Sequence, residues 1–155
     1  MTNLIRNGEF CDAEYWSVAH PEHVQFNKGD CNITSPGYVS QEIIFPSAAE
    51  EEYVLSARMK TEPGFTACVT LTLHPSGKVL ALPLENASNW QVLTDWTEAP
   101  PGTTGATVKL ETKAETGVAT SQFGSLALFK LEKKPSGNIL GQIFAWWRSL
   151  FGARG

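Results

Sequence analysis

Cysteine, charged residues and long apolar runs are all scarce in this chain, and each shortage excludes a class of protein. The 155 residues include three cysteines, Cys11, Cys31 and Cys68, with no CxxC pair. This odd number argues against a disulfide scaffold and fits a reducing compartment. Charged residues make up 18% of the chain and the formal net charge is −4. Because this composition provides no basic field for a phosphate backbone, we expect no nucleic-acid partner.

The chain is also poor in segments that target or cross membranes. No apolar run approaches the roughly 20 residues needed to span a bilayer. The first seven residues, Met1 to Asn7, show neither a cationic start followed by a long apolar stretch nor a small-residue cleavage site. We therefore predict no signal peptide and expect a protein made in the cytoplasm, with incorporation into a virion as an option.

Motifs for catalysis and for cofactors are missing as well. The sequence contains no GxSxG motif, no cysteine beside a histidine and no GxxxxGK loop. The segment His20 to His23 lies between Cys11 and Cys31, but this spacing matches no established zinc pattern. We therefore predict a chain that is not an enzyme, with no metal site and no cofactor.

The chain is instead rich in apolar and polar residues that alternate with a period of two, as in half-buried β-strands. The clearest runs are residues 53–60, 65–73 and 106–110. Shorter β-type runs cover residues 3–6, 24–27, 38–45, 78–84, 90–97 and 125–131. Gly, Pro and Asn turns separate them. With 155 residues enough for one domain, the pattern predicts an all-β antiparallel sandwich of jelly-roll type, with eight or nine strands.

The last residues follow a different period. After a Pro-Ser-Gly linker at 135–137, residues 138–152 are predicted to form an amphipathic α-helix that follows the 1–134 module. Its apolar stripe, spaced at i, i+3/i+4 and i+7, contains Ile139, Leu140, Ile143, Phe144, Trp147, Leu150 and Phe151. Such a stripe must be buried, and the sequence leaves three partners open: the chain's own sandwich, another subunit, and a membrane surface.

Several segments in register resemble a known family. They are Asn3 to Phe10 with Trp16, residues 52–60, Asn89-Trp90, and residues 96–110. Over about residues 3–132 the chain is similar to carbohydrate-binding modules with the galactose-binding-domain-like jelly roll. The resemblance implies a non-catalytic fold that binds saccharides, with Trp16 and Trp96 filling the sandwich.

One departure from this family concerns calcium. Such modules usually close with a pair of aspartates, one of which helps to hold a structural Ca²⁺. The equivalent stretch here, Gln122 to Leu128, contains no acid. Since Ca²⁺ takes six to eight oxygen ligands, Glu9 and Asp12 alone make a poor site, and we do not expect calcium.

Four residues are candidates for contact with a glycan. A sugar site needs aromatic faces for the pyranose ring and amide, carboxylate or guanidinium groups for its hydroxyls. Tyr38, Arg58, His74 and Trp90 lie at strand starts or on faces opposite the apolar alternation. We therefore predict these four as the ligand-binding residues.

The function predicted from the sequence is a non-catalytic structural module. We expect a small homo-oligomeric subunit of a larger particle, such as a decoration, cement or fibre-type protein of a phage virion, attached through protein-protein contacts of the 138–152 helix. Two alternatives stand beside it. One is a glycan-binding, lectin-like module, and the other is attachment to a membrane surface through the helix.

Overall fold

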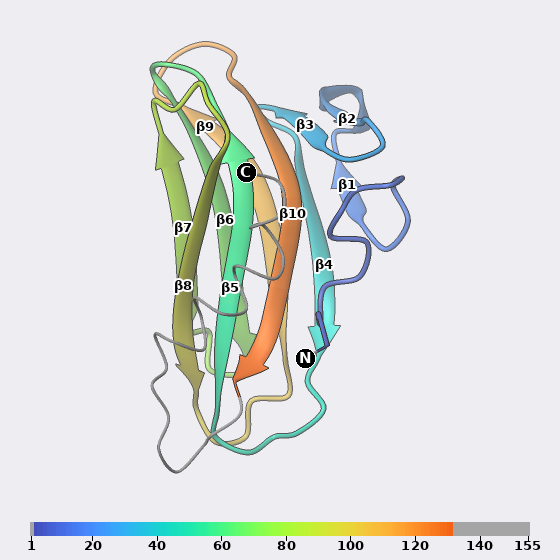
Figure 1. Ribbon diagram of the computed structural model, residues 1–155, viewed down its shortest axis with the longest axis vertical. Helices are drawn as coiled ribbons and strands as arrows, with labels where there is room; N and C mark the ends of the chain where they lie inside the picture. The colour runs from blue at the N-terminus through green and yellow to red at the C-terminus, as the bar shows by residue number, and fades with distance from the viewer. Residues whose placement is uncertain (1, 132–155) are drawn as a thin grey trace.

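The structure is a computed structural model that describes residues 2–131 (Figure 1). The predicted linker at 135–137 and the predicted helix at 138–152 lie outside the described residues. Within these residues, no helix is long and apolar enough to cross a membrane.

Two five-stranded antiparallel sheets pack face to face and confirm the predicted β-sandwich. The first sheet has the order β1-β4-β9-β6-β7 and the second has the order β2-β3-β10-β5-β8. In Figure 1 the strands β8, β5 and β10 of the second sheet lie in front of the first sheet. The elements are β1 (Ser17–Ala19), the 3-10 helix η1 (Pro21–His23), β2 (Val24–Phe26), β3 (Cys31–Thr34), β4 (Tyr38–Ile44), β5 (Glu51–Lys60), β6 (Phe65–His74), β7 (Val79–Glu85), β8 (Gln91–Ala99), β9 (Gly105–Ala114) and β10 (Thr120–Leu131).

The period-two alternation places one side of each long strand in the core. In β5, the side chains of Tyr53, Leu55, Ala57 and Met59 are fully buried in the main core cluster. The residues between them, Arg58 among them, point away from the first sheet because successive side chains of a strand alternate between faces. The hydrophobic pattern therefore decides which side chains are available on the outer faces.

The N-terminal segment differs from the prediction. Residues 3–6 were expected to form a strand, but they form bends and turns. The Asn3 side chain replaces part of a strand ladder: its Oδ1 accepts hydrogen bonds from the amides of Ile5 and Leu128, and its Nδ2 donates to the carbonyl of Leu126. An asparagine side chain that bonds main-chain groups competes with regular pairing. The short strands β1 and β3 were not predicted.

The two tryptophans that the resemblance assigned to the core have different environments. Trp16 is buried and stacks on Phe10 with ring centroids 5.2 Å apart. Trp96 is 41% exposed, so the expectation that it fills the sandwich is wrong. The reason is register: Trp96 pairs with Val54 on β5, and this pair lies on the outer face of the second sheet.

Candidate functional site

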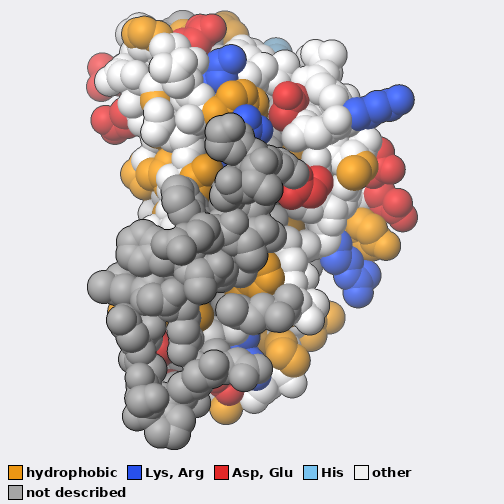
Figure 2. All heavy atoms as spheres, viewed as in Figure 1, with side chains coloured by type: hydrophobic (Ala, Val, Ile, Leu, Met, Phe, Trp, Pro, Cys, Tyr) orange, Lys and Arg blue, Asp and Glu red, His pale blue; other side chains and the backbone are white. Residues whose placement is uncertain are grey.

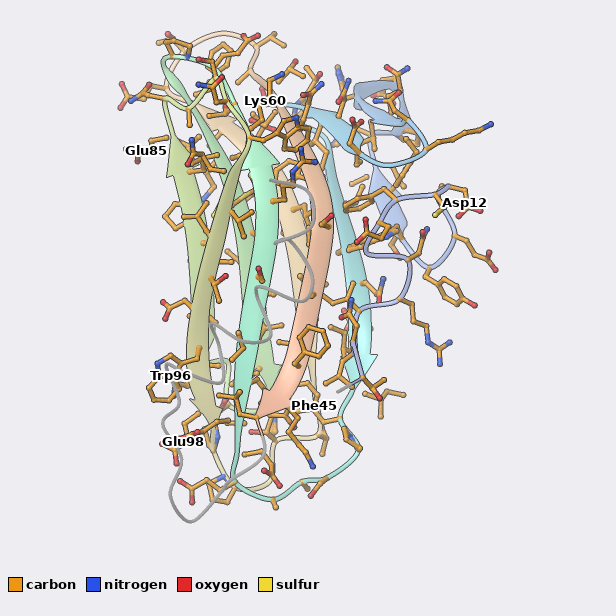
Figure 3. All side chains as sticks on the ribbon, viewed as in Figure 1. Asp12, Phe45, Lys60, Glu85, Trp96 and Glu98 are labelled. Carbon is orange, nitrogen blue, oxygen red and sulfur yellow. The ribbon has the colours of Figure 1, made fainter. Side chains whose placement is uncertain are left out.

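One end of the outer face of the second sheet gathers cationic, amide and aromatic side chains. Lys60 pairs with Gln122 of β10, and Arg58 pairs with Gly124. Trp90 comes directly before β8, beside the Met59–Gln91 pair. We call Arg58, Lys60, Trp90, Gln122 and Gly124 the Arg58–Trp90 cluster. Figure 2 shows Lys and Arg side chains beside hydrophobic ones at the upper end of this face, and Figure 3 labels Lys60 there.

Arg58 and Trp90 are in stacking contact. The guanidinium carbon of Arg58 lies 4.0 Å from the Trp90 ring centroid, and Nζ of Lys60 lies 5.9 Å from it. A cation over the face of an indole is attracted by the ring quadrupole. Gly124 has no side chain, and a Cβ there would lie 3.6 Å from Nη1 of Arg58 and 3.7 Å from Cζ3 of Trp90. The guanidinium and the ring therefore lie close against the main chain of β10.

A row of amide side chains extends the cluster across the sheet. Asn32 of β3 pairs with Gln25 of β2 on one side and with Gln122 of β10 on the other. Gln122 in turn pairs with Lys60 of β5, so the four side chains form one row on the outer face. Oδ1 of Asn32 is buried and has no hydrogen-bond partner among the described residues. Buried acceptors are normally satisfied by a protein group, a water molecule or a ligand. The row thus supplies hydrogen-bonding groups next to an aromatic face.

A shallow hollow lies at the end of β5 and β10 next to this row. Its lining residues are Lys60, Thr61, Glu62, Thr120, Ser121 and Gln122. Thr61 and Ser121 are buried and their hydroxyls are 2.9 Å apart, so they form the fixed floor. Lys60 and Gln122, which are half-buried, belong to both the hollow and the cluster.

The structure brings together only two of the four predicted ligand-binding residues. Arg58 and Trp90 lie together on the second sheet, whereas Tyr38 and His74 lie on the outer face of the first sheet, on the opposite side of the sandwich. Within that face they are far apart, because Tyr38 pairs with Glu111 near one end of β9 and His74 pairs with Gly105 at the other. Nζ of Lys109 lies 4.3 Å from the Tyr38 ring centroid. Nε2 of His74 lies 2.7 Å from Oγ1 of Thr107, which donates a hydrogen bond to a Glu42 oxygen at 2.7 Å. One saccharide site cannot include all four residues.

The other end of the same outer face is apolar. Val54, Ala127, Phe129 and Leu131 form a hydrophobic cluster separate from the main core, and Trp96 lies beside Val54. We call these five residues the apolar outer patch. The sequence carried a signal for it, since β10 is apolar on both faces near its end, which is typical of a strand covered on both sides. The prediction did not use this signal.

The two carboxylates considered for calcium, those of Glu9 and Asp12, have hydrogen-bond partners within the chain. An Oε2 atom of Glu9 accepts a hydrogen bond from the Ser125 hydroxyl at 3.1 Å, and Oδ1 of Asp12 accepts from the amide of Glu14 at 2.9 Å. Among residues 2–131, no group of three or more His, Cys, Asp or Glu side chains is placed to hold a metal ion.

The three cysteines are free, and two of them are buried. Burial raises the pKa of the Cys31 thiol to about 12, and the nearby Asp30 adds to this shift. Burial also raises the pKa of Cys68. Since the thiolate is the reactive form, Cys31 and Cys68 are packing residues.

Comparisons with known proteins identify the fold. No protein-family profile matches the chain, and no curated protein is significantly similar. The chain is similar in structure to a family 61 carbohydrate-binding module in complex with β-1,4-galactotriose, with a TM-score of 0.64 and 16% identity over 84% of this chain and 100% of that one. A family 4 carbohydrate-binding module matches with a TM-score of 0.58 and 15% identity over 82% of this chain and 99% of that one.

A third similar structure comes from a virus. It is the enzymatically active domain of tailspike protein 4 of bacteriophage CBA120, with a TM-score of 0.61 and 14% identity over 83% of this chain and 21% of that one. At these identities the comparisons establish the fold alone. The described part of the chain has the two-sheet fold of galactose-binding-domain-like carbohydrate-binding modules.

Proposed function

We propose that this chain is a non-catalytic glycan-binding module whose ligand lies on the Arg58–Trp90 cluster. The observation that carries the proposal is the position of Trp90, stacked on Arg58 beside a row of amide side chains on an open sheet face. This reading supports the glycan-binding alternative over the structural-subunit reading that the sequence favoured.

The chemistry of the cluster suits a saccharide. The edge and free area of the indole offer an apolar surface to the C–H groups of a pyranose. Gln122, Asn32 and Gln25 supply both donors and acceptors, which hydroxyl groups require. Arg58 and Lys60 supply only donors, so they favour a sugar oxygen or a carboxylate of an acidic sugar over a hydroxyl that must donate.

The first test is glycan binding by the full chain. The initial probes are β-1,4-galactotriose and xylohexaose, which are the saccharides bound in two of the similar structures, a family 61 module and a xylanase that carries a family 22 module. A glycan array that includes uronic-acid sugars extends the search. The absence of binding to any saccharide at millimolar concentration would reject the proposed function.

Matched variants then locate the site. Trp90→Ala is expected to weaken binding by about tenfold or more, since an aromatic contact contributes on the order of 1 kcal/mol beyond its buried area. Tyr38→Ala on the opposite face is the control and should leave affinity unchanged. Gln122→Ala is a second variant at the site in case Trp90→Ala unfolds. If only Tyr38→Ala weakened glycan binding, the binding site would lie on the first sheet, and the proposed function would stand.

A second candidate function is a subunit of a larger particle such as a phage virion. It is favoured by the similarity to part of a bacteriophage tailspike and by the apolar outer patch. In this case the full chain should form a homo-oligomer or bind a partner subunit. The native mass of the purified chain tests the first possibility, and a monomer that binds glycan would favour the module.

Attachment to a membrane surface through residues 138–152 stays a prediction from the sequence. Co-sedimentation of the full chain with anionic liposomes tests it. Recovery of all the protein in the supernatant would remove this alternative.

A further inference from the structure

Four of the five residues of the apolar outer patch are buried although they face away from the core. Val54, Ala127, Phe129 and Leu131 are between 1% and 5% exposed. The first sheet, which buries the inner face of β5 and β10, lies on the other side of them. In Figure 1 no described strand lies in front of β5 and β10 at this end. A layer other than the two sheets is therefore needed to cover these four side chains.

On the outer face of the second sheet, the side chains change from polar to apolar along β5 and β10. This change marks where the covering layer begins. The Arg58 and Lys60 rows are polar, and the next row contains the small residues Ala127 and Ser56. Beyond this row come the apolar side chains, which end beside Glu52 and Glu98. Figure 3 labels Trp96 and Glu98 toward the lower end of β8, far from Lys60. The apolar half is a separate surface from the proposed glycan site.

The chain itself supplies a segment of matching chemistry. β10 ends at Leu131, which belongs to the patch, and the amphipathic segment begins seven residues later at Asn138. Seven residues span at most about 25 Å, so the start of the segment can reach any part of the patch. As a helix, residues 138–151 would be about 21 Å long. The patch itself extends about 13 Å along β10, from Ala127 to Leu131, and across the sheet to Trp96 on β8.

We propose that residues 138–151 of the same chain pack on the apolar outer patch as a third layer of the sandwich. The stripe that contains Ile143 and Trp147 supplies the apolar side chains, and the patch supplies a flat apolar floor with Trp96 at its rim. The short connection favours the chain's own patch over that of a second copy, because a short tether gives a high effective concentration. A second copy is the competing occupant.

A consequence concerns the proposed glycan site and rests on the proposed function. With the lower half of the face occupied, only the Arg58–Trp90 end stays open to a ligand. The site is then short and closed at one side by the third layer, whereas an uncovered sheet face would allow a saccharide to run its full length.

Site-specific photocrosslinking in the full chain tests the third layer. Trp96, which is at the rim and 41% exposed, is replaced by p-benzoyl-phenylalanine. After irradiation, we expect crosslinks from position 96 to residues within 139–151 in the product of monomer mass. The same probe at Tyr38, on the opposite face, is the control and should give none.

Two further substitutions in the Trp96 probe background test whether the apolar stripe is responsible. Ile143→Asp puts a charge on the stripe and should reduce the crosslink yield several-fold, since a buried unpaired charge is costly. Gln142→Asp adds the same charge off the stripe and should keep the yield. Crosslinks found only at dimer mass, crosslinks absent from 139–151, or equal yields in the two variants would each overturn the proposal. These outcomes do not depend on glycan binding.

Discussion

The guanidinium of Arg58 stacks on the ring of Trp90, with 4.0 Å from its central carbon to the ring centroid. Arg58 lies near the end of β5, whereas Trp90 lies just before β8, so the contact holds the start of an edge strand against an interior strand. It also orients the indole on the outer face, where the amide row lies. This pair links the stability of the upper sheet end to the proposed ligand site.

The first prediction concerns the geometry of this pair. Arg58→Lys keeps the positive charge but loses the planar group that stacks on the ring. We expect the free energy of unfolding to fall by about 0.5–1 kcal/mol, the usual size of an exposed cation–π contact. Urea denaturation followed by tryptophan fluorescence measures it. Lys60→Arg is the control, and an unchanged Arg58→Lys variant would show that the stacking does not stabilise the sheet end.

The second prediction contrasts two glycines that lie against main-chain carbonyl groups. A Cβ at Gly8 would collide with the carbonyl oxygen of Leu126, which is main chain and cannot move aside. Gly8→Ala is therefore expected to destabilise the protein by on the order of 1–3 kcal/mol. At Gly124 the nearest atom would be the carbonyl oxygen of Gly29 at 3.4 Å, an ordinary contact.

Gly124→Ala is the matched variant and should fold with nearly unchanged stability. Its added methyl lies between β10 and the Arg58–Trp90 pair, so weaker glycan binding without lower stability is the expected result. Thermal unfolding of both alanine variants makes the comparison. Equal destabilisation would contradict the packing described at the two positions.

Much of the sandwich could be predicted because its long strands repeat the alternation of apolar and polar residues many times. The residues of β5 and β6 alternate over eight or more positions, so their strand type and buried face followed from the sequence. Residues 3–6 form a short β-type run in the sequence, but Asn3 makes long-range hydrogen bonds to main-chain groups of Leu126 and Leu128, which no local pattern reveals. Strand register likewise decides the exposure of Trp96, and register is a property of paired strands.

The candidate site was predictable only in part for the same reason. Arg58, Tyr38 and His74 were correctly placed on outer faces by alternation. Alternation does not say which of two sheets a strand joins, so the separation of Tyr38 and His74 from Arg58 was not foreseen. The amide row with Asn32 was missed because it comes from three strands that meet only in the folded sheet.

The third prediction concerns the reactivity of the cysteines. Cys11 is exposed, whereas Cys31 and Cys68 are buried and their pKa values are raised. At pH 8 a thiol reagent such as DTNB should therefore label one thiol in the folded protein and three after denaturation. Cys11→Ser should abolish labelling of the folded protein. Rapid labelling of a second thiol would mean that Cys31 or Cys68 is accessible.

The same shift sets the sign of a pH effect. The pKa of Cys31 is 9.0 in the unfolded reference and about 12 in the folded protein. Folding favours the neutral thiol. The contribution of this thiol to the free energy of unfolding is therefore fully present below pH 9 and is lost as the pH rises toward 12. We expect the stability of the wild type to fall more steeply in this range than that of Cys31→Ala. Parallel urea titrations at pH 8 and pH 10 measure the difference.

The fourth prediction concerns a hydrogen bond between the two sheets. The hydroxyl of Thr112 on β9 donates to the carbonyl of Ile33 on β3 at 2.7 Å, and the contact is buried. Thr112→Val keeps the shape but removes the donor, and it should cost about 1–2 kcal/mol of stability. Thr70→Val, on the half-exposed outer face of β6, is the control and should change stability by less than about 0.5 kcal/mol. Equal effects would indicate that the inter-sheet bond contributes nothing.

The fifth prediction concerns the length of the bound saccharide. If the apolar outer patch is covered, the open part of the face is confined to the rows of Lys60 and Arg58, because Ser56 in the next row is fully buried. These two rows lie about 7 Å apart along β5 at 3.3 Å per residue. Affinity should then rise over the first few sugar units of an oligosaccharide series and stop rising for longer chains. Isothermal titration calorimetry with oligomers of the best glycan from the array measures this plateau. Continued gains up to the hexasaccharide would mean that the ligand runs past Arg58 onto the apolar half, which is incompatible with a third layer at that place.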